Sequence, residues 1–159
     1  MPSTTLLLLV VLLVANAFAI DIRNNTGITV SGLSSGAFAT VQMQIAYSSL
    51  VDGSAVIAGG MYYGAQGNVL NALTLMENPG LYSSVFEAIT DIEVPSLAAT
   101  GMIDPVDNLR HVNSWLFAGT KDTTVNPENL FFLKNFLQRY GVHVHTTATV
   151  PAQHSFPTV

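Results

Sequence analysis

Three residues that together can hydrolyse an ester lie in order along this 159-residue chain: Ser34, Asp122 and His154. A serine hydroxyl becomes a nucleophile when a histidine takes its proton, and a carboxylate holds that histidine in the right tautomer. Ser34 is the centre of the pentapeptide Gly32–Gly36, which reads Gly-Leu-Ser-Ser-Gly, and a β-branched run, Ile28–Val30, precedes it. An amphipathic stretch follows. A strand, a G-x-S-x-G pattern and then a helix are typical of a nucleophile elbow, in which the serine sits in a strained turn.

The surroundings of Ser34 also predict how negative charge on the substrate would be stabilised. We expect Gly32 and Gly36 to let the strand and the helix pass close together without a Cβ clash. The helix that begins here presents its free N–H groups to a developing oxyanion. The backbone N–H of Ser35 is therefore a candidate oxyanion donor. For this motif alone, the alternative is a Gly/Ser turn without a catalytic role.

Asp122 and His154 each follow an apolar strand pattern, which is where open parallel sheets place their active sites. Asp122 comes after the run Trp115–Ala118, and His154 lies in a loop between Pro151 and Pro157. Taken singly, the alternatives are a solvated or capping acid and a surface histidine. The order serine, acid, histidine is that of the α/β-hydrolase triad. The three residues together therefore predict ester hydrolysis with His154 as the general base and Asp122 as its partner.

The other histidines are weaker candidates for chemistry. His111 lies in a polar connection, whereas His143 and His145 stand two apart on one predicted strand and face the same side. Such a pair could bind a metal, but no third ligand is evident, and we expect an ordinary strand face and no metal. No cofactor is implied because a serine triad requires only water. A cysteine nucleophile and a thiolate metal site are excluded, since the chain has no cysteine.

The first 19 residues have the pattern of a secretory signal peptide. Leu6–Val14 is an unbroken apolar run, too short to span a bilayer, and Ala17–Ala19 has the small-x-small form of a cleavage site. An uncleaved membrane anchor is the alternative. We therefore expect a secreted protein without stable membrane insertion, whose residues 20–159 form one α/β-hydrolase-like domain. Asn24 begins a glycosylation sequon just after the predicted cleavage site.

The charge of the chain limits its partners. The formal net charge is −5, and no basic cluster is present, which argues against nucleic acid or anionic membranes as partners. Only 9% of the residues are charged, against about 25% in a usual soluble domain. The surface is therefore covered by uncharged polar side chains, or part of it is apolar and contacts something.

The hydrophobic pattern alternates between strand and helix, which predicts an α/β protein with a mostly parallel sheet and helices on both faces. Residues 61–100 look irregular, with breaks at Pro79 and Pro95. We expect strands at 28–31, 54–58, 114–118 and 142–149, and helices at 36–49, 69–76, 84–89 and 127–140.

Four motifs in this order resemble those of secreted polyhydroxybutyrate depolymerases of the single-domain type, which have a circularly permuted α/β-hydrolase fold. The motifs are Val30–Phe38, Ala58–Tyr63, Gly119–Pro127 and Gln153–Thr158. The resemblance implies Ser34 as nucleophile, Asp122 as acid and His154 as base, acting on poly(3-hydroxybutyrate)-like polyesters. Because related enzymes cleave other esters, small esters are alternative substrates. A polymer-binding esterase needs an exposed apolar rim, for which Met61, Tyr62 and Tyr63 are candidates; core packing is the alternative for each.

Two departures from the family pattern matter. Gly64 stands where the family often has a cysteine, so the disulfide expected by analogy is absent. The chain also ends at Val159, five residues after His154, and we expect it to lack the other half of the sheet and one oxyanion donor. Such a loss typically lowers kcat ~10²–10³-fold. The strand 28–31 would then be an open edge prone to self-association. The alternative function is thus a catalytically impaired fragment or a non-catalytic secreted interaction module.

Overall fold

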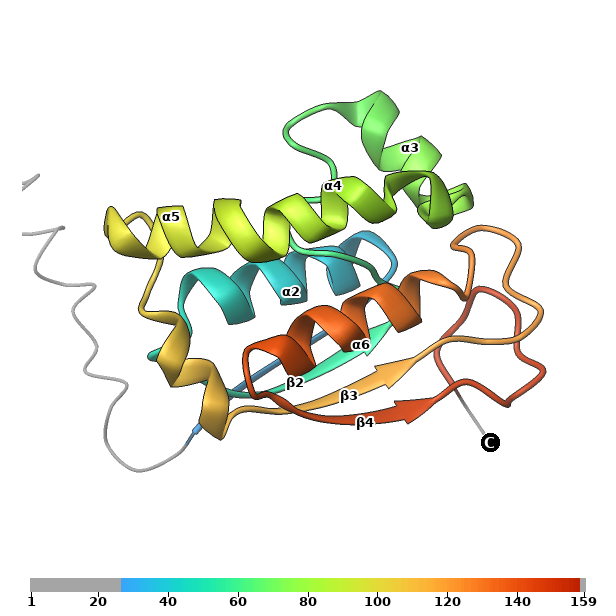
Figure 1. Cartoon of the computed structure of the whole chain (residues 1–159). Helices are drawn as coiled ribbons and strands as arrows, with labels where there is room; N and C mark the ends of the chain where they lie inside the picture. Colours follow the sequence, from blue (N-terminus) through green and yellow to red (C-terminus); the bar gives the residue numbers. More distant parts are fainter. Residues whose placement is uncertain (1–26, 158–159) are drawn as a thin grey trace, which may run out of the picture.

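Four parallel strands pair in the order in which they occur along the chain, β1-β2-β3-β4 (Figure 1). The computed structural model describes residues 27–157. The strands are β1 (Ile28–Leu33), β2 (Val51–Ile57), β3 (Asn113–Phe117) and β4 (His143–Thr147). Each strand overlaps the range predicted for it from the sequence. Because the strands are parallel, their carboxyl ends lie at one edge of the sheet, and the loops that follow them meet there.

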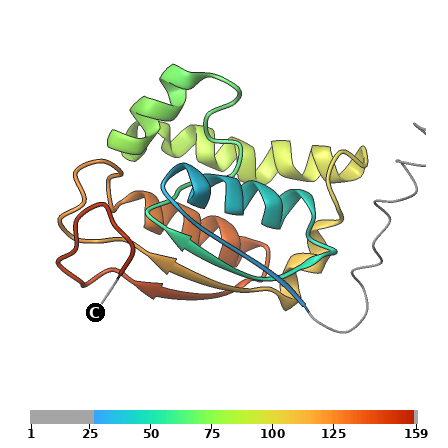
Figure 2. The same cartoon turned by 180° about the vertical axis from the view of Figure 1, so that it is seen from behind.

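The helices of the described residues all lie on one face of this sheet, as the two opposite views show (Figures 1 and 2). They are α2 (Ser35–Ala46), α3 (Val69–Glu77), η1 (Pro79–Tyr82), α4 (Ser83–Ala88), η2 (Ile89–Glu93), α5 (Val94–Ala99), η3 (Val106–His111) and α6 (Asn129–Arg139). The prediction of helices on both faces is therefore wrong for residues 27–157. The other face carries Trp115, His143 and His145 and has an open depression over the amino-terminal halves of the strands.

Two helices cover the sheet directly because their apolar residues recur at helical spacing. Ala37, Val41 and Ile45 of α2 are fully buried, and Leu133 and Leu137 of α6 are buried in the same core. Residues four apart lie on one side of a helix, so each helix presents a continuous apolar stripe to the strands. In the described part of the chain, no helix has the length and hydrophobicity needed to cross a membrane.

A buried polar cluster lies between α2 and the middle strands. The Nε2 of Gln44 donates to the Oγ of Ser114 (2.9 Å), and the Oγ of Ser54 donates to the Oε1 of Gln44 (2.7 Å). Gln44 is fully buried. Because each of these groups has a partner, the cluster fixes the position of α2 on the sheet without leaving a buried polar atom unsatisfied.

The segment after β2 is more helical than the sequence indicates, since α4, η2 and α5 form a continuous helical run over 83–99 (Figure 1). The predicted break at Pro95 is wrong because a π turn accommodates the proline. In η2 the N–H of Val94 donates to the carbonyl of Ile89, and Pro95 has no N–H to donate. The carbonyl of Thr90 would therefore be left without a helical partner, and the hydroxyl of Tyr140 donates to it instead.

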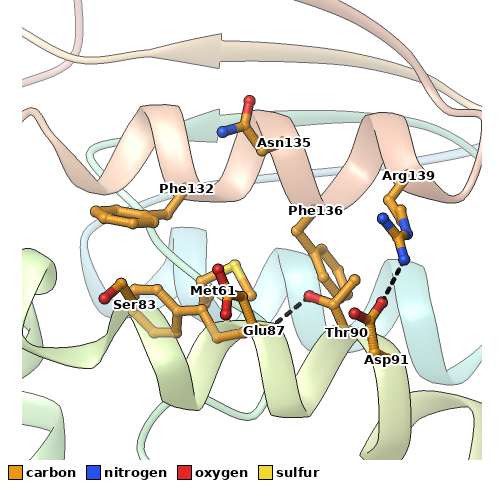
Figure 3. A pocket seen from close by; sticks show the side chains of 10 residues that line it. Met61, Ser83, Glu87, Thr90, Asp91, Phe132, Asn135, Phe136 and Arg139 are labelled. Carbon is orange, nitrogen blue, oxygen red and sulfur yellow. Dashed lines mark hydrogen bonds and ion pairs between the residues drawn. The ribbon is translucent and has the colours of Figure 1, made fainter.

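Tyr140 closes one side of this helical layer. Burial, together with the nearby Asp91 carboxylate, raises the pKa of the Tyr140 hydroxyl to about 12. Beside it, the guanidinium of Arg139 pairs with Asp91 at 2.7 Å. This ion pair belongs to the wall of a cavity of about 250 Å³ between α4–η2 and α6, where Phe132 and Phe136 also lie (Figure 3).

Candidate active site

Ser34 occupies a strained turn between β1 and α2. Its backbone has φ 57° and ψ −123°, a combination that residues other than glycine rarely adopt. The N–H of Ser34 still donates to the carbonyl of Ile57 in β2 (3.0 Å), while its carbonyl already accepts the N–H of Phe38 in α2 (3.0 Å). The chain therefore changes from strand to helix within one residue, as the nucleophile-elbow pattern predicts.

Of the two glycines in this turn, Gly32 alone is required by the available space. A Cβ on Gly32 would lie 2.2 Å from the carbonyl carbon of Gly36, closer than any real contact. A Cβ on Gly36 would meet nothing within 4 Å. The prediction that both glycines avoid a clash is therefore confirmed for Gly32 and wrong for Gly36. Strand β1 passes close to the backbone of α2 at this turn. The Cβ position of Gly32 faces that backbone, whereas the Cβ position of Gly36 faces open space.

The carboxylate of Asp122 is buried, with 1% of the side chain exposed, and both of its oxygens are hydrogen-bonded. The Oδ1 accepts the backbone N–H groups of Thr124 (2.9 Å) and Val125 (3.0 Å). The Oδ2 lies 2.8 Å from the Nδ1 of His154. The two amides fix the orientation of the carboxylate, so its second oxygen holds the imidazole in one position.

The loops that carry Asp122 and His154 are bound to each other through their backbones. The N–H of Thr120 donates to the carbonyl of Val150 (2.9 Å), and the N–H of Lys121 donates to the carbonyl of Ala152 (3.0 Å). Gly119 allows this approach, since a Cβ there would lie 2.2 Å from the oxygen of Ala152. This role of Gly119 is not among the features predicted from the sequence, although a glycine directly after a predicted strand is a usable signal.

The three predicted catalytic residues therefore come from the same edge of the sheet. Ser34 follows β1, Asp122 follows β3 and His154 follows β4. The outer strands, β1 and β4, are about 14 Å apart, since neighbouring strands are separated by ~4.8 Å. The loop after β4 spans part of this distance because it lies against the loop after β3. The structure brings Asp122 and His154 into contact. Among residues 27–157 it contains no hydrogen bond between Ser34 and His154.

The candidate oxyanion donor Ser35 is the first residue of α2, where N–H groups have no partner within the helix. The predicted rim residues have different environments. Tyr63 is 40% exposed, but Met61 and Tyr62 are only 2% and 6% exposed and belong to the core. The prediction of an exposed rim is therefore wrong for Met61 and Tyr62. Burial also raises the pKa of the Tyr62 hydroxyl.

The remaining candidates lie away from this edge or outside the described residues. His111 ends η3 and is exposed, and His143 and His145 are exposed on β4. Within residues 27–157, no group of three or more His, Cys, Asp or Glu side chains is placed to hold a metal ion. The predicted signal peptide, residues 1–19, and the candidate glycosylation residue Asn24 lie outside the described residues.

Most of the chain is similar to known proteins. No protein-family model matches the chain. A poly(3-hydroxybutyrate) depolymerase of Delftia acidovorans is 35% identical over 140 residues, which are 85% of this chain and 28% of that protein. A polyhydroxybutyrate depolymerase of Talaromyces funiculosus is 30% identical over 142 residues, 85% of this chain and 39% of that protein. The chain therefore resembles the polyhydroxybutyrate depolymerase family over 85% of its own length.

The solved structures agree with this assignment. The crystal structure of a PHB depolymerase from Penicillium funiculosum has a TM-score of 0.70 at 30% identity, covering 85% of this chain and 41% of that one. A variant of Arabidopsis thaliana SOBER1 shares the fold, with a TM-score of 0.51 at 18% identity over 94% of this chain and 57% of that one. The described residues thus form part of an α/β-hydrolase fold. The chain spans 28% and 39% of the length of the two curated relatives.

Proposed function

We propose that this chain is a secreted serine esterase that hydrolyses ester bonds of poly(3-hydroxybutyrate)-like polyesters or short-chain esters, with Ser34, Asp122 and His154 as its triad. One observation supports the proposal above the others. The buried Asp122 carboxylate holds His154 at 2.8 Å on the same edge of the sheet as the strained Ser34 turn. A fixed acid–histidine pair on the same edge of the sheet as a strained serine is the combination from which a serine triad is built.

In the proposed reaction, the Oγ of Ser34 attacks the ester carbonyl while the Nε2 of His154 takes its proton. Asp122 stabilises the imidazolium through the Nδ1 hydrogen bond. The backbone N–H of Ser35 donates to the oxyanion of the tetrahedral intermediate. His154 then protonates the leaving alcohol, and an acyl group remains on Ser34. Water, deprotonated by His154, releases the acid and restores the hydroxyl of Ser34.

The polyester part of the proposal rests on the relatives and on the surface near the site. A PHB depolymerase variant crystallised with an R3HB trimer has a TM-score of 0.70 to this chain at 29% identity. Tyr63 is exposed, and several apolar side chains of α3 and η1 are exposed beyond it. These are Val69 (71%), Leu70 (67%), Leu73 (49%) and Leu81 (75%). Exposed apolar side chains on neighbouring elements are suited to contact a water-insoluble polymer.

Covalent labelling with a fluorophosphonate probe tests the serine chemistry directly. We expect the purified chain to be labelled, and we expect labelling to disappear in Ser34→Ala and His154→Ala. Ser31→Ala is the matched control, because Ser31 is an exposed serine of β1, the strand that precedes Ser34, and has no role in the proposed reaction. A folded wild-type chain that is not labelled, or a Ser34→Ala chain that still is, contradicts the proposal.

Secretion is tested separately, since it depends on residues outside those described. Expression in a secreting host should yield a mature chain that begins at Ile20, with glycan on Asn24 if the host modifies the sequon. Mass spectrometry of the intact secreted chain reads both features. An N-terminus at Met1 would contradict cleavage after Ala19.

A second candidate function is a non-catalytic interaction module that associates through β1. The observation in its favour is that, among residues 27–157, β1 pairs with β2 alone, and Ile28–Leu33 contains no charged residue or proline. An outer strand of this kind can pair with a strand of another molecule. Size-exclusion chromatography with light scattering would show self-association. An associated chain that is not labelled at Ser34 favours this second function.

A further inference from the structure

A cavity of about 320 Å³ lies beside the proposed nucleophile, between the first turns of α2, the segment 61–67 and α3. Ser35, which directly follows Ser34, is part of its wall. The rest of the wall is mainly apolar, with Phe38, Leu75 and Met76 among its residues. A concave apolar site with few polar groups is typical of a ligand pocket.

The wall formed by segment 61–67 is held in an unusual backbone conformation. Among the described residues, four that are not glycine have positive φ: Ser34, Ala58, Tyr63 and Gln66. Two of these four, Tyr63 (φ 54°) and Gln66 (φ 49°), line the cavity. Such conformations are costly and persist where the surrounding structure enforces them, which is common at ligand-binding sites. Positive φ at residues other than glycine is therefore found both in the cavity wall and in the turn at Ser34.

The opposite wall, α3, is tied to the loop that carries Asp122. The N–H of Asn126 donates to the carbonyl of Met76 (2.7 Å), and the Nδ2 of Asn129 donates to the same carbonyl (3.1 Å). On its inner side α3 packs closely against segment 61–67, since a Cβ on Gly64 would lie 2.6 Å from Leu75. Both walls are thus fixed by direct contacts, and the cavity is preformed.

We propose that this cavity binds the alkyl group of an ester, about six to ten carbons long, while the ester carbonyl lies at Ser34; this inference rests on the proposed function. A cavity of ~150 Å³ is enough to hold benzene. The cavity here has about twice that volume. The methyl side group of a 3-hydroxybutyrate unit would leave most of it empty. The cavity therefore favours esters with medium-length acyl or side-chain alkyl groups, which extends the substrates of the proposed function beyond 3-hydroxybutyrate polyesters and short-chain esters.

Binding can be measured without turnover by using the full chain with Ser34→Ala. The ligands are methyl octanoate and methyl butanoate, which differ by four methylenes, and their affinities are read by ligand-observed NMR. Each buried methylene contributes about a fourfold gain in affinity, so four give at most about 200-fold. We expect octanoate to bind at least ~10-fold more tightly, since the cavity is open on one side to solvent.

Filling the cavity should remove this difference. Ala72→Phe and Ala39→Phe each place a ring in the space, and each is expected to bring the ratio of the two affinities below ~3. Ala99→Phe is the matched control, because Ala99 is exposed at the end of α5 and lies away from the cavity. Circular dichroism melts confirm that each variant is folded. If Ala72→Phe does not fold, Ala39→Phe decides, since Ala39 is exposed and needs no core space.

The outcomes separate this inference from the proposed function. Equal affinities for the two esters overturn the cavity assignment, and so does a preference for octanoate that neither phenylalanine variant reduces. A chain that reacts with fluorophosphonate but does not distinguish the esters is an esterase without this pocket. If the two phenylalanine variants at Ala39 and Ala72 reduce a preference for octanoate but Ser34 does not react with fluorophosphonate, the cavity assignment holds and the esterase proposal is contradicted.

Discussion

Replacing Gly119 with alanine should separate the two loops that bring Asp122 and His154 together. The backbone of Gly119 does not have positive φ, so alanine is compatible with its local conformation. The added Cβ would lie 2.2 Å from the oxygen and 2.7 Å from the carbonyl carbon of Ala152. An ordinary contact needs at least 3.4 Å. The Ala152 carbonyl must therefore move by about 1 Å.

This displacement acts on the proposed site because His154 is two residues from Ala152. The Ala152 carbonyl also accepts the N–H of Lys121, next to Asp122, so both partners are affected. A shift of about 1 Å stretches the Asp122–His154 contact from 2.8 Å to beyond hydrogen-bonding range. We expect the reactivity of Ser34 to fall about 100-fold. Overpacking should also lower the free energy of unfolding by about 1–3 kcal/mol.

The assay is the second-order rate constant for fluorophosphonate labelling, measured together with the thermal midpoint. Gly80→Ala is the matched control, because a Cβ on Gly80 would lie 3.8 Å from its nearest neighbour, Glu128, and Gly80 is in η1. Its labelling rate should equal that of the wild-type chain. If Gly119→Ala is labelled at the wild-type rate while it is folded, the loop contact does not set the geometry of the acid–base pair and the reasoning fails.

Three further predictions use the same chain. Asp122→Asn should lower the labelling rate about 10⁴-fold while the chain stays folded, because an amide no longer holds the tautomer of His154 that accepts a proton. Equal labelling rates for this variant and the wild-type chain would exclude Asp122 as the partner of His154. Gly32→Ala should lower the thermal midpoint strongly and Gly36→Ala should not, given the 2.2 Å clash at the first position and the open space at the second. The folded pKa of Tyr140, about 12, lies above its unfolded value of 10, so its contribution to stability is full below pH 10 and is lost as the pH rises toward 12. In Tyr140→Phe, urea midpoints measured from pH 9 to 11 should therefore decline less than those of the wild-type chain.

Much of the fold follows from local patterns that the sequence displays. The four strands were predictable because short β-branched or apolar runs end in turn residues, as Leu116 and Phe117 do before Gly119. The elbow at Ser34 was predictable for the same reason, since a strand, G-x-S-x-G and a helix follow one another directly. The pairing of Asp122 with His154 followed from placing each acid or base after a parallel strand.

The remaining features depend on contacts between distant residues, which periodicity does not encode. Met61 and Tyr62 look like rim residues because they lie in an irregular segment, yet the helical run over 83–99 and α6 cover them. Tyr62, for example, stacks on Phe136 with ring centroids 6.4 Å apart. The continuation of the helix through Pro95 likewise depends on Tyr140, which is 45 residues away and satisfies the carbonyl of Thr90. Neither partner is visible from the local sequence.

The proposed site is thus built from two parts that are stabilised in different ways. The part after β1 and β2 contains all the positive-φ residues other than glycine among those described, from Ser34 to Gln66. The part after β3 and β4 contains none, and backbone hydrogen bonds hold Asp122 and His154 there. Strained conformations persist only while the packing around them is intact, so the nucleophile depends on the contact of α2 with β1 and β2. The acid–base pair depends instead on the contact at Gly119. A substitution at Gly32 should therefore disturb the nucleophile and leave the Asp122–His154 contact in place, while a substitution at Gly119 should do the reverse.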